Sequence, residues 1–384
     1  MKSKLLLSSA LVGSLAVTGI ASAQTTITGS LDLSYKTISN KGTITKQTDS
    51  GFGRESQINV ANKGKLNNGM NYAAGFSLEF DGKSGGATGD TTSTSTLGGA
   101  IQPNIQRISR ENIYMDLILG NTTLSVGADH LNNMSFSSAP RVTVNAATAV
   151  ASAQLVTSGG DDVAAGTASG GSAYLFYPGA AALGSSNYMG LGLQQATPFG
   201  TLTGQYFPKA SAQQAANDGV ARTNVKDAYE LHFRGDLGVK GLTFNAGYNV
   251  ISHATPSTTQ EGNQKGKAVG VGYNFGQIAV GVQRNYTDNG VQLGQAGKID
   301  TKSTEYGVTF AATKELSIGA TVVKTDGTFR STTPMTADED IRAVTVGYNL
   351  GAISVSATYA SLENARGVNQ NDSDIVLVRA NTRF

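Results

Sequence analysis

Cysteine and tryptophan are both absent from this chain of 384 residues, and only 7 prolines are present. Without cysteine the protein can form neither disulfides nor a zinc site built on thiolates. The absence is compatible with an exported protein that uses no disulfides. With 48 glycines and abundant serine, threonine and asparagine, the composition would indicate disorder if the chain lacked periodicity. Periodicity is present, and it decides the fold class.

Long apolar runs are also missing after the first residues, which excludes a helical membrane span in the remainder of the chain. The one apolar stretch, residues 5–20, follows a basic start with Lys2 and Lys4 and precedes the small residues Ala21-Ser-Ala23. This order predicts a signal peptide over residues 1–23, cleaved before Gln24. A retained membrane helix is the alternative, and the shortness of the run disfavours it.

An excess of charge of one sign is the third absence. The 29 Lys and Arg residues become 27 once Lys2 and Lys4 are removed with the signal, against 27 Asp and Glu, so the formal net charge of the mature chain is zero. A nucleic-acid partner requires a basic surface. No nucleic-acid partner is therefore predicted.

What the chain has instead is a hydrophobic pattern with a period of two. It recurs in residues 27–35, 71–80, 229–234 and 242–250, where apolar and polar residues alternate. In the last segment, Val376 and Val378 alternate with Arg379 and Asn381, and the chain ends on Phe384. A strand of about ten residues, apolar on one side and polar on the other, suits a membrane strand beside an aqueous lumen.

A soluble β-sandwich also alternates, so the connections decide between the two folds. Seven short connections are predicted, near residues 63–69, 120–121, 198–200, 238–241, 276, 313–314 and 351. Eight longer polar loops alternate with them, at residues 39–51, 82–107, 130–186, 209–225, 254–265, 288–301, 326–339 and 364–373. This layout predicts an all-β, transmembrane antiparallel β-barrel of about sixteen strands, with both termini on the short-turn side. The second strand, around residues 54–61, has the least defined register.

Strand parity assigns charged side chains to the inner wall of this barrel. Asp32 on the first strand and Arg379 on the last lie at comparable heights, which predicts an ion pair across the seam. Arg54 shares the parity of outward-facing Ile58, so it faces the lumen only if a bulge intervenes. The candidate wall residues are Asp32, Glu79, Arg110, Asp116, Glu230, Arg234, Arg379, Arg383 and Arg54. Their mixture of signs predicts weak charge selectivity, and the alternative is a salt-bridge network that only rigidifies the barrel.

No catalytic or metal site is predicted. His130, His232 and His253 fall on different segments, no Gly-x-Ser-x-Gly motif surrounds a serine, and no His-x-x-x-His spacing occurs. We therefore expect neither an enzyme nor a cofactor, although a Ser-His-Asp site assembled in space stays open.

Several segments together carry a family resemblance. They are residues 23–32 (AQTTITGSLD), residues 63–72 (KGKLNNGMNY) at the first turn, residues 197–200 (TPFG) at the third turn, and Phe384. In this order and spacing, residues 24–384 resemble a Gram-negative general diffusion porin, the sixteen-stranded trimeric type of the outer membrane.

The resemblance implies a homotrimer in outer-membrane lipid that forms a water-filled channel for passive diffusion of small hydrophilic solutes and ions. It implies that the barrel-assembly machinery recognises Phe384 as a C-terminal signal. It also implies that the long loop, residues 130–186, folds into the lumen with Asp161 and Asp162 on the acidic side of a constriction. The alternative role of these two carboxylates is to solvate the tip of the loop. A channel that prefers a sugar or an anion, or a barrel that mainly displays its surface loops, remains an alternative function.

Overall fold

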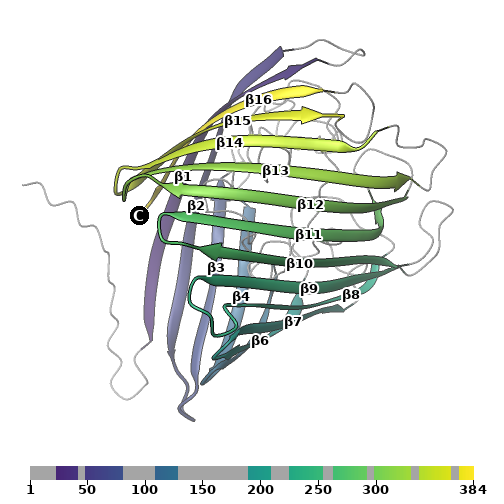
Figure 1. Ribbon diagram of the computed structural model, residues 1–384. Coiled ribbons are helices and arrows are strands. Elements are labelled where there is room, and N and C mark those ends of the chain that lie inside the picture. Colours follow the sequence, from purple (N-terminus) through teal and green to yellow (C-terminus); the bar gives the residue numbers. More distant parts are fainter. Residues whose placement is uncertain are drawn as a thin grey trace, which may run out of the picture.

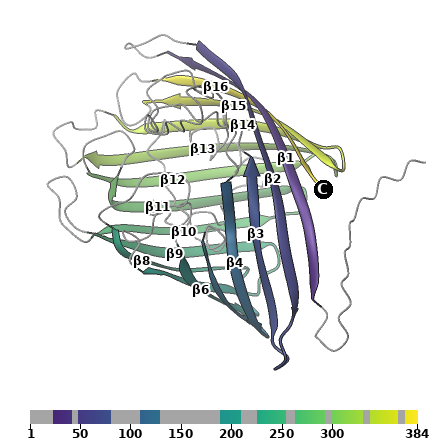
Figure 2. The ribbon, with the colours of Figure 1, turned by 180° about the vertical axis from the view of Figure 1, so that it is seen from behind.

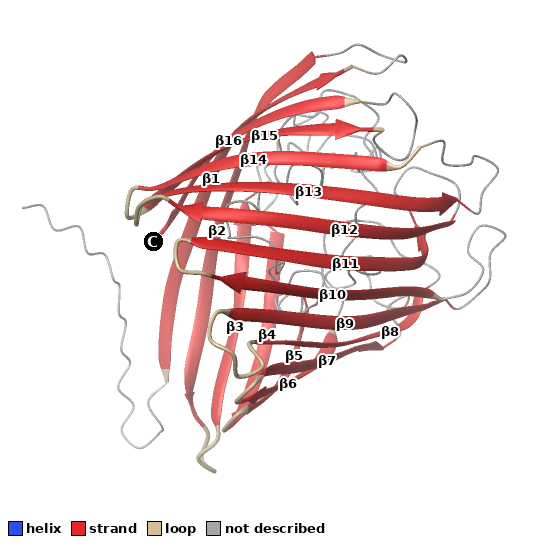
Figure 3. Cartoon of the chain, in the orientation of Figure 1, coloured by secondary structure: helices blue, strands red, loops and turns tan. Residues whose placement is uncertain are grey.

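The computed structural model describes residues 23–41, 48–80, 109–128, 189–208, 225–253, 263–291, 298–329, 337–364 and 372–384. Strands make up most of these ranges (Figure 3). No helix within them is long and apolar enough to cross a membrane. The predicted signal peptide lies outside the described residues except for Ala23, and the first strand begins at Gln24.

Sixteen strands occupy the described ranges, in agreement with the number predicted from the sequence. They are β1 Gln24–Asn40, β2 Thr48–Lys65, β3 Asn71–Phe80, β4 Ser109–Leu119, β5 Thr122–Ala128, β6 Gly190–Thr197, β7 Gly200–Pro208, β8 Val225–Gly235, β9 Leu242–His253, β10 Gln264–Asn274, β11 Ile278–Val291, β12 Lys298–Ala311, β13 Leu316–Phe329, β14 Glu339–Asn349, β15 Ile353–Glu363 and β16 Ser373–Arg383.

The strands form one closed sheet. Each strand pairs with its neighbours in sequence, and β1 also pairs with β16, so the sheet curls into a barrel (Figures 1 and 2). All of the pairings are antiparallel. Along the seam, closure leaves no edge strand with a row of unpaired backbone groups. The predicted all-β antiparallel barrel is confirmed.

The seam between β1 and β16 is paired along its whole length. At the short-turn end, Gly29 and Phe384 exchange backbone hydrogen bonds of 2.7 and 3.0 Å. At the other end, the backbone N–H of Lys41 donates to the carbonyl oxygen of Asp372 over 2.7 Å. The Lys41 ammonium donates to the Asp374 carboxylate, and this hydrogen bond raises the pKa of Lys41 above its ordinary value. The seam is therefore hydrogen-bonded from Gly29 to Lys41.

Seven short turns lie together at one end of the barrel, and Phe384 lies at the same end (Figure 1). Several of them use the same local chemistry. The Oδ1 atom of Asn274 accepts the N–H of Gly276 at 2.7 Å, and Asn349 does the same for Gly351 at 2.8 Å. Gly276 and Gly351 have φ values of 100° and 91°, a conformation that side chains disfavour. The eight remaining connections contain the residues that the structure does not describe.

Large apolar side chains point outward from the barrel at alternate positions. Leu193 and Val344 are 50% and 49% exposed, whereas the inward-facing Ser125 and Thr345 are 0% and 1% exposed. This arrangement is the reverse of that in a water-soluble protein, where large apolar side chains pack inside. The outer face therefore requires hydrocarbon as its solvent, which excludes the soluble β-sandwich.

Gly29→Ala is expected to weaken the seam. A β-carbon at Gly29 would lie 2.4 Å from ring carbons of Phe384 and 3.1 Å from the carbonyl oxygen of Gln57. Gly204→Ala is the matched control, because its β-carbon would meet only Leu231, at 3.9 Å. We expect the apparent unfolding temperature, followed by the heat-dependent band shift on SDS gels, to fall by roughly 2–4 °C for Gly29→Ala only. Equal stability of the two variants would contradict a role for the Phe384 ring in closure.

Candidate functional site

The inner face of the barrel is the candidate functional site, because it holds polar side chains on strands all around the lumen. They alternate with the outward-facing apolar residues of the same strands. Buried polar residues on this face include Asp32, Ser77, Asp116, Thr203, Glu230, Asn245, Gln283, Glu305, Thr325, Glu339 and Thr358. A wall of this composition suits an aqueous interior.

The ion pair predicted across the seam is present. Arg379 donates to the Asp32 carboxylate through both Nε and Nη2, and Asn381 Nδ2 donates to the same oxygen over 3.1 Å. The side chains of Arg379 and Asp32 are only 14% and 10% exposed. Arg383 follows on the same face of β16, where it is exposed at the short-turn mouth. Because burial weakens solvent screening, loss of either partner would leave an uncompensated charge at the seam between the first and last strands.

Glu230 lies buried on the inner face of β8, and two neighbours contact its carboxylate. His232 Nδ1 lies 3.3 Å from Oε1, and Asn249 of β9 donates from Nδ2 to Oε2 over 3.4 Å. Arg234 shares this face nearer the short turns, half-buried and without an ion pair to any described residue. The row of Glu230, His232 and Arg234 faces inward as its parity indicated, and the structure adds Asn249 to it.

Two lumen carboxylates were missed by the sequence reasoning. Glu305 on β12 and Glu339 on β14 face inward and are both 0% exposed. Glu305 pairs in register with Gln283, which belongs to a polar ladder. In that ladder Asn245 donates to Gln283 over 3.1 Å, and Gln283 donates to Asn285 over 2.9 Å. Polar residues at alternate positions along β12 were the signal that would have identified its inward face.

Tyr114 and Asp116 face the lumen from β4, and for Asp116 this is the face that strand parity indicated. The ring of Tyr114 lies against Gly75 of β3, where an added β-carbon would come within 2.9 Å of its Cε1 atom. Asp116 is 8% exposed. This inward tyrosine therefore covers a glycine on the neighbouring strand.

A β-bulge at Asn112 changes the register of β4 beyond these residues. Asn112 has a φ of 51°, in the left-handed region, and its side-chain amide donates to Ser77 Oγ over 2.8 Å. Past the bulge, the backbone of Ser77 pairs with that of Glu111. The side chain of Arg110, one of the predicted wall residues, lies outside the part of the structure that is described. One extra residue reverses the parity of a strand, and nothing in the alternation revealed it.

The backbone register also locates two other candidate wall residues. Glu79 pairs with Gln57, which faces the lumen and donates to Ser77. Arg54 pairs with Leu33, which is exposed on the outer face. The side chains of Glu79 and Arg54 lie outside the described part of the structure. Asp161, Asp162 and the rest of the predicted loop at residues 130–186 lie outside the described residues.

An apolar area interrupts the polar lining on β13 to β16. We call it the inner apolar patch, and it consists of Val323, Ile341, Ala343, Ala360, Leu362, Ile375 and Leu377. These side chains face the lumen, yet none is more than 7% exposed and Leu362 is 0% exposed. This part of the wall is therefore covered and not in contact with water. The apolar run Ile375-Val-Leu-Val378, with both faces of β16 apolar, was an overlooked sign of it.

Metal coordination has no basis in the described ranges, where no three His, Asp or Glu side chains are grouped so that they would hold an ion. Of the three histidines, His232 contacts Glu230 as above. His130 lies outside the described residues.

Known proteins resemble the chain in both sequence pattern and fold. A sequence profile described as Gram-negative porin matches residues 8–381. No curated protein matches the sequence. The fold is similar to that of the anion-selective porin from Comamonas acidovorans, with a TM-score of 0.57, 13% identity, and coverage of 94% of this chain and 100% of that one. A loop L8 deletion mutant of OmpT, an outer membrane protein of Vibrio cholerae, is similar at a TM-score of 0.57 and 13% identity, covering 94% of this chain and 99% of its own. Identities this low show a shared fold alone.

Substitution of either partner in the Asp32–Arg379 pair is expected to destabilise the barrel by about 3 kcal/mol, because the remaining charge is left in a mostly buried site. The double variant Asp32→Asn with Arg379→Gln should cost clearly less than the sum of the single changes. A double-mutant cycle on urea unfolding in lipid vesicles measures the difference. Strictly additive effects would mean that the two side chains do not stabilise each other.

Proposed function

Because the chain belongs to the Gram-negative porin family, we propose that it forms a water-filled channel for passive diffusion of small hydrophilic solutes and ions across the outer membrane. The observation that carries the proposal is a closed sixteen-strand barrel with an apolar outer face and a polar inner face. A barrel of this strand number is wide enough to leave an aqueous channel after its side chains are placed. The family supports a channel and not an enzyme.

We further propose that charge selectivity is weak. Asp32 and Arg379 neutralise each other, and the carboxylates of Glu305 and Glu339 are withdrawn from the water-filled path by their burial. Other described residues with inward parity carry charges of both signs, among them Asp116, Glu230, Lys36, Arg234 and Arg383. A channel that prefers anions or a sugar would differ from a general diffusion porin at its narrowest point. Measurements of ion selectivity distinguish the anion-preferring channel from the general porin.

The constriction is proposed to come from residues 130–186, with Asp161 and Asp162 on its acidic side. The cover over the inner apolar patch supports this, because a segment of chain folded into the lumen would bury such a surface. The many alanine, serine, glycine and threonine residues of segment 130–186 suit close packing against the barrel wall. Loop carboxylates that face basic wall groups create a transverse field, which orders water and favours polar solutes over apolar ones.

A homotrimer is the proposed assembly, and it rests on the family. Small outward-facing residues such as Ala74 and Ala246 permit close approach of a neighbouring barrel. The terminal Phe384 is 74% exposed, which suits its proposed recognition by the barrel-assembly machinery in outer-membrane lipid. A barrel whose main role is display of its loops would have the same outer surface but would not conduct.

Purified mature protein in a planar lipid bilayer tests the channel directly. We expect large, ohmic conductance steps that arrive in groups of three, and a reversal potential close to zero in a salt gradient, because wall charges of both signs line the path. Correctly folded protein that leaves the bilayer silent would overturn the proposal in favour of loop display.

Replacement of Asp161 and Asp162 by Asn is expected to shift the reversal potential toward anion preference, because the acidic side of the constriction loses its charge. Asp288→Asn with Asp326→Asn is the matched control, since it removes two carboxylates that lie on the outer face of β11 and β13. Identical reversal potentials for wild type and the Asp161/Asp162 variant would place this pair away from the narrowest point.

A further inference from the structure

The strand β1 runs on beyond the seam at the short-turn end of the barrel. The seam closes there with the mutual backbone hydrogen bonds of Gly29 and Phe384. β1 begins earlier, at Gln24, and residues 24–28 are paired with β2 alone among the described strands. We call residues 24–28 the β1 extension. Figures 1 and 2 show β1 continuing past the C terminus of the chain.

Two residues of the β1 extension present their backbone to the side that β16 has left. Along an antiparallel strand, the backbone groups of successive residues point alternately to one neighbour and to the other. Gly29 directs both its N–H and its C=O to Phe384, so the same groups of Ile27 and Thr25 point to that side as well. Neither residue has a backbone partner there among the described residues. This free edge therefore offers N–H donors and C=O acceptors to an added strand.

The β1 extension lies outside the hydrocarbon layer. Its outward Thr25 accepts a hydrogen bond of 2.9 Å from Asn62 of β2, and Asn62 accepts one of 2.6 Å from the Tyr72 hydroxyl. These polar side chains take the outward positions that apolar residues occupy where the strands face lipid. Backbone groups without a partner are not tolerated in hydrocarbon either. Residues 24–28 are all exposed, so the free edge is accessible from water.

The sequence of the β1 extension lacks the features that usually protect an exposed edge. It reads Gln24-Thr-Thr-Ile-Thr28, without charge or proline, and its register with β2 contains no bulge. Natural proteins place lysine, proline or a bulge on such edges to prevent the addition of another strand. Threonine and isoleucine instead favour the extended conformation. Pairing with β2 therefore holds an edge that is ready to accept a partner.

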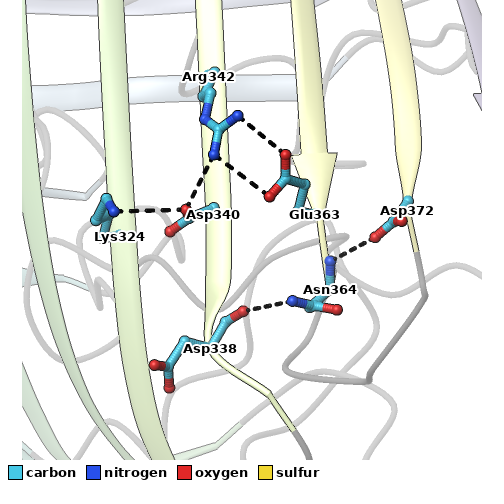
Figure 4. Close-up of polar contacts among 7 residues, drawn as sticks. All are labelled: Lys324, Asp338, Asp340, Arg342, Glu363, Asn364 and Asp372. Atoms are coloured by element: carbon cyan, nitrogen blue, oxygen red, sulfur yellow. Dashed lines mark hydrogen bonds and ion pairs between the residues drawn. The ribbon is translucent and has the colours of Figure 1, made fainter.

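The other end of β1 does not offer such an edge. There the backbone N–H of Lys41 donates to the carbonyl oxygen of Asp372 over 2.7 Å. Figure 4 shows that Asn364 ties the neighbouring strand ends together. Its Nδ2 donates to the carbonyl oxygen of Asp338 over 3.0 Å, and its backbone N–H donates to Asp372 Oδ1 over 2.9 Å. The free edge of β1 is thus confined to the short-turn end.

The side chains around the free edge define the peptide that fits it. A strand added there continues the line of β16 beyond Phe384 and runs antiparallel to β1. Its outward side chains would meet Ile27 and Phe384, which are 62% and 74% exposed. Its inward side chains would lie near Arg383 and, across Gln24, near Lys63, both exposed and without an ion pair to a described residue. The edge therefore matches a peptide in which apolar and acidic residues alternate.

We propose that the free edge of the β1 extension binds an extended, acidic peptide segment of a periplasmic protein by β-strand addition. Main-chain hydrogen bonds to Ile27 and Thr25 supply the affinity, and the alternating side chains supply the specificity. A second copy of this chain fits less well, because pairing of this edge with the same edge of another copy has two-fold symmetry, which a trimer lacks. The proposal rests on the short turns facing the periplasm and not on conductance.

Binding of synthetic peptides to the purified barrel in nonionic detergent tests the proposal. The probe is Glu-Val-Ser-Val-Glu, acetylated at its start and fluorescently labelled at its end, and fluorescence anisotropy measures its affinity. In the added strand the valines pair with Ile27 and Thr25, so N-methylation of both valines removes the donors that face β1. N-methylation of the serine and the last glutamate is the matched control, because those N–H groups point away from β1.

We expect N-methylation of the valines to weaken binding about tenfold or more, because two main-chain hydrogen bonds are lost, and the control peptide to stay within about threefold of the probe. Equal effects of the two N-methylated peptides, or no binding of the probe, would overturn the proposal.

A variant of the barrel tests the same edge from the other side. Ile27→Glu is expected to bind the probe about tenfold more weakly, because it removes an apolar contact and places like charges opposite each other. Leu350→Glu is the matched control, since Leu350 is 61% exposed in the turn between β14 and β15, away from the edge. Equal affinities of the two variants would contradict the proposal. Loss of subunits by Ile27→Glu alone, seen by native mass spectrometry, would overturn it by showing that this edge joins copies of the chain.

Discussion

Backbone hydrogen bonding in a hydrocarbon solvent is the constraint on which the rest of this structure depends. A strand that crosses the membrane has no water to satisfy its N–H and C=O groups, so each group needs a partner on a neighbouring strand. Only a closed sheet provides this for every strand, and closure requires that β1 meet β16 in register. The mutual hydrogen bonds of Gly29 and Phe384 complete that ladder at its end.

Closure then assigns a different solvent to each face of every strand. Outward positions take valine, leucine and aromatic residues because they face lipid, and inward positions take serine, threonine, asparagine and acidic residues. Charge appears on the outer face of β10 to β13 toward the long connections, at Lys267, Lys302 and Lys324. The same alternation therefore produces both the aqueous lumen and the lipid-facing surface.

The inner face combines two kinds of wall that have different consequences. The Asp32–Arg379 pair and the polar ladder through Gln283 are compatible with water, and they keep charges of the wall in fixed positions. The inner apolar patch on β13 to β16 is withdrawn from water. The proposed constriction depends on this difference.

The sequence by itself determined the strands, their number and the seven short turns, because alternation and Asn-x-Gly turns are local properties of the chain. It also determined that Asp32 meets Arg379, since both lie at similar heights on the two strands that closure joins. Only the tertiary structure decided the bulge at Asn112, the inner apolar patch and the free edge of β1 at residues 24–28. These features depend on the register between strands, and a shift of one residue between partners exchanges the two faces without altering the pattern of either strand.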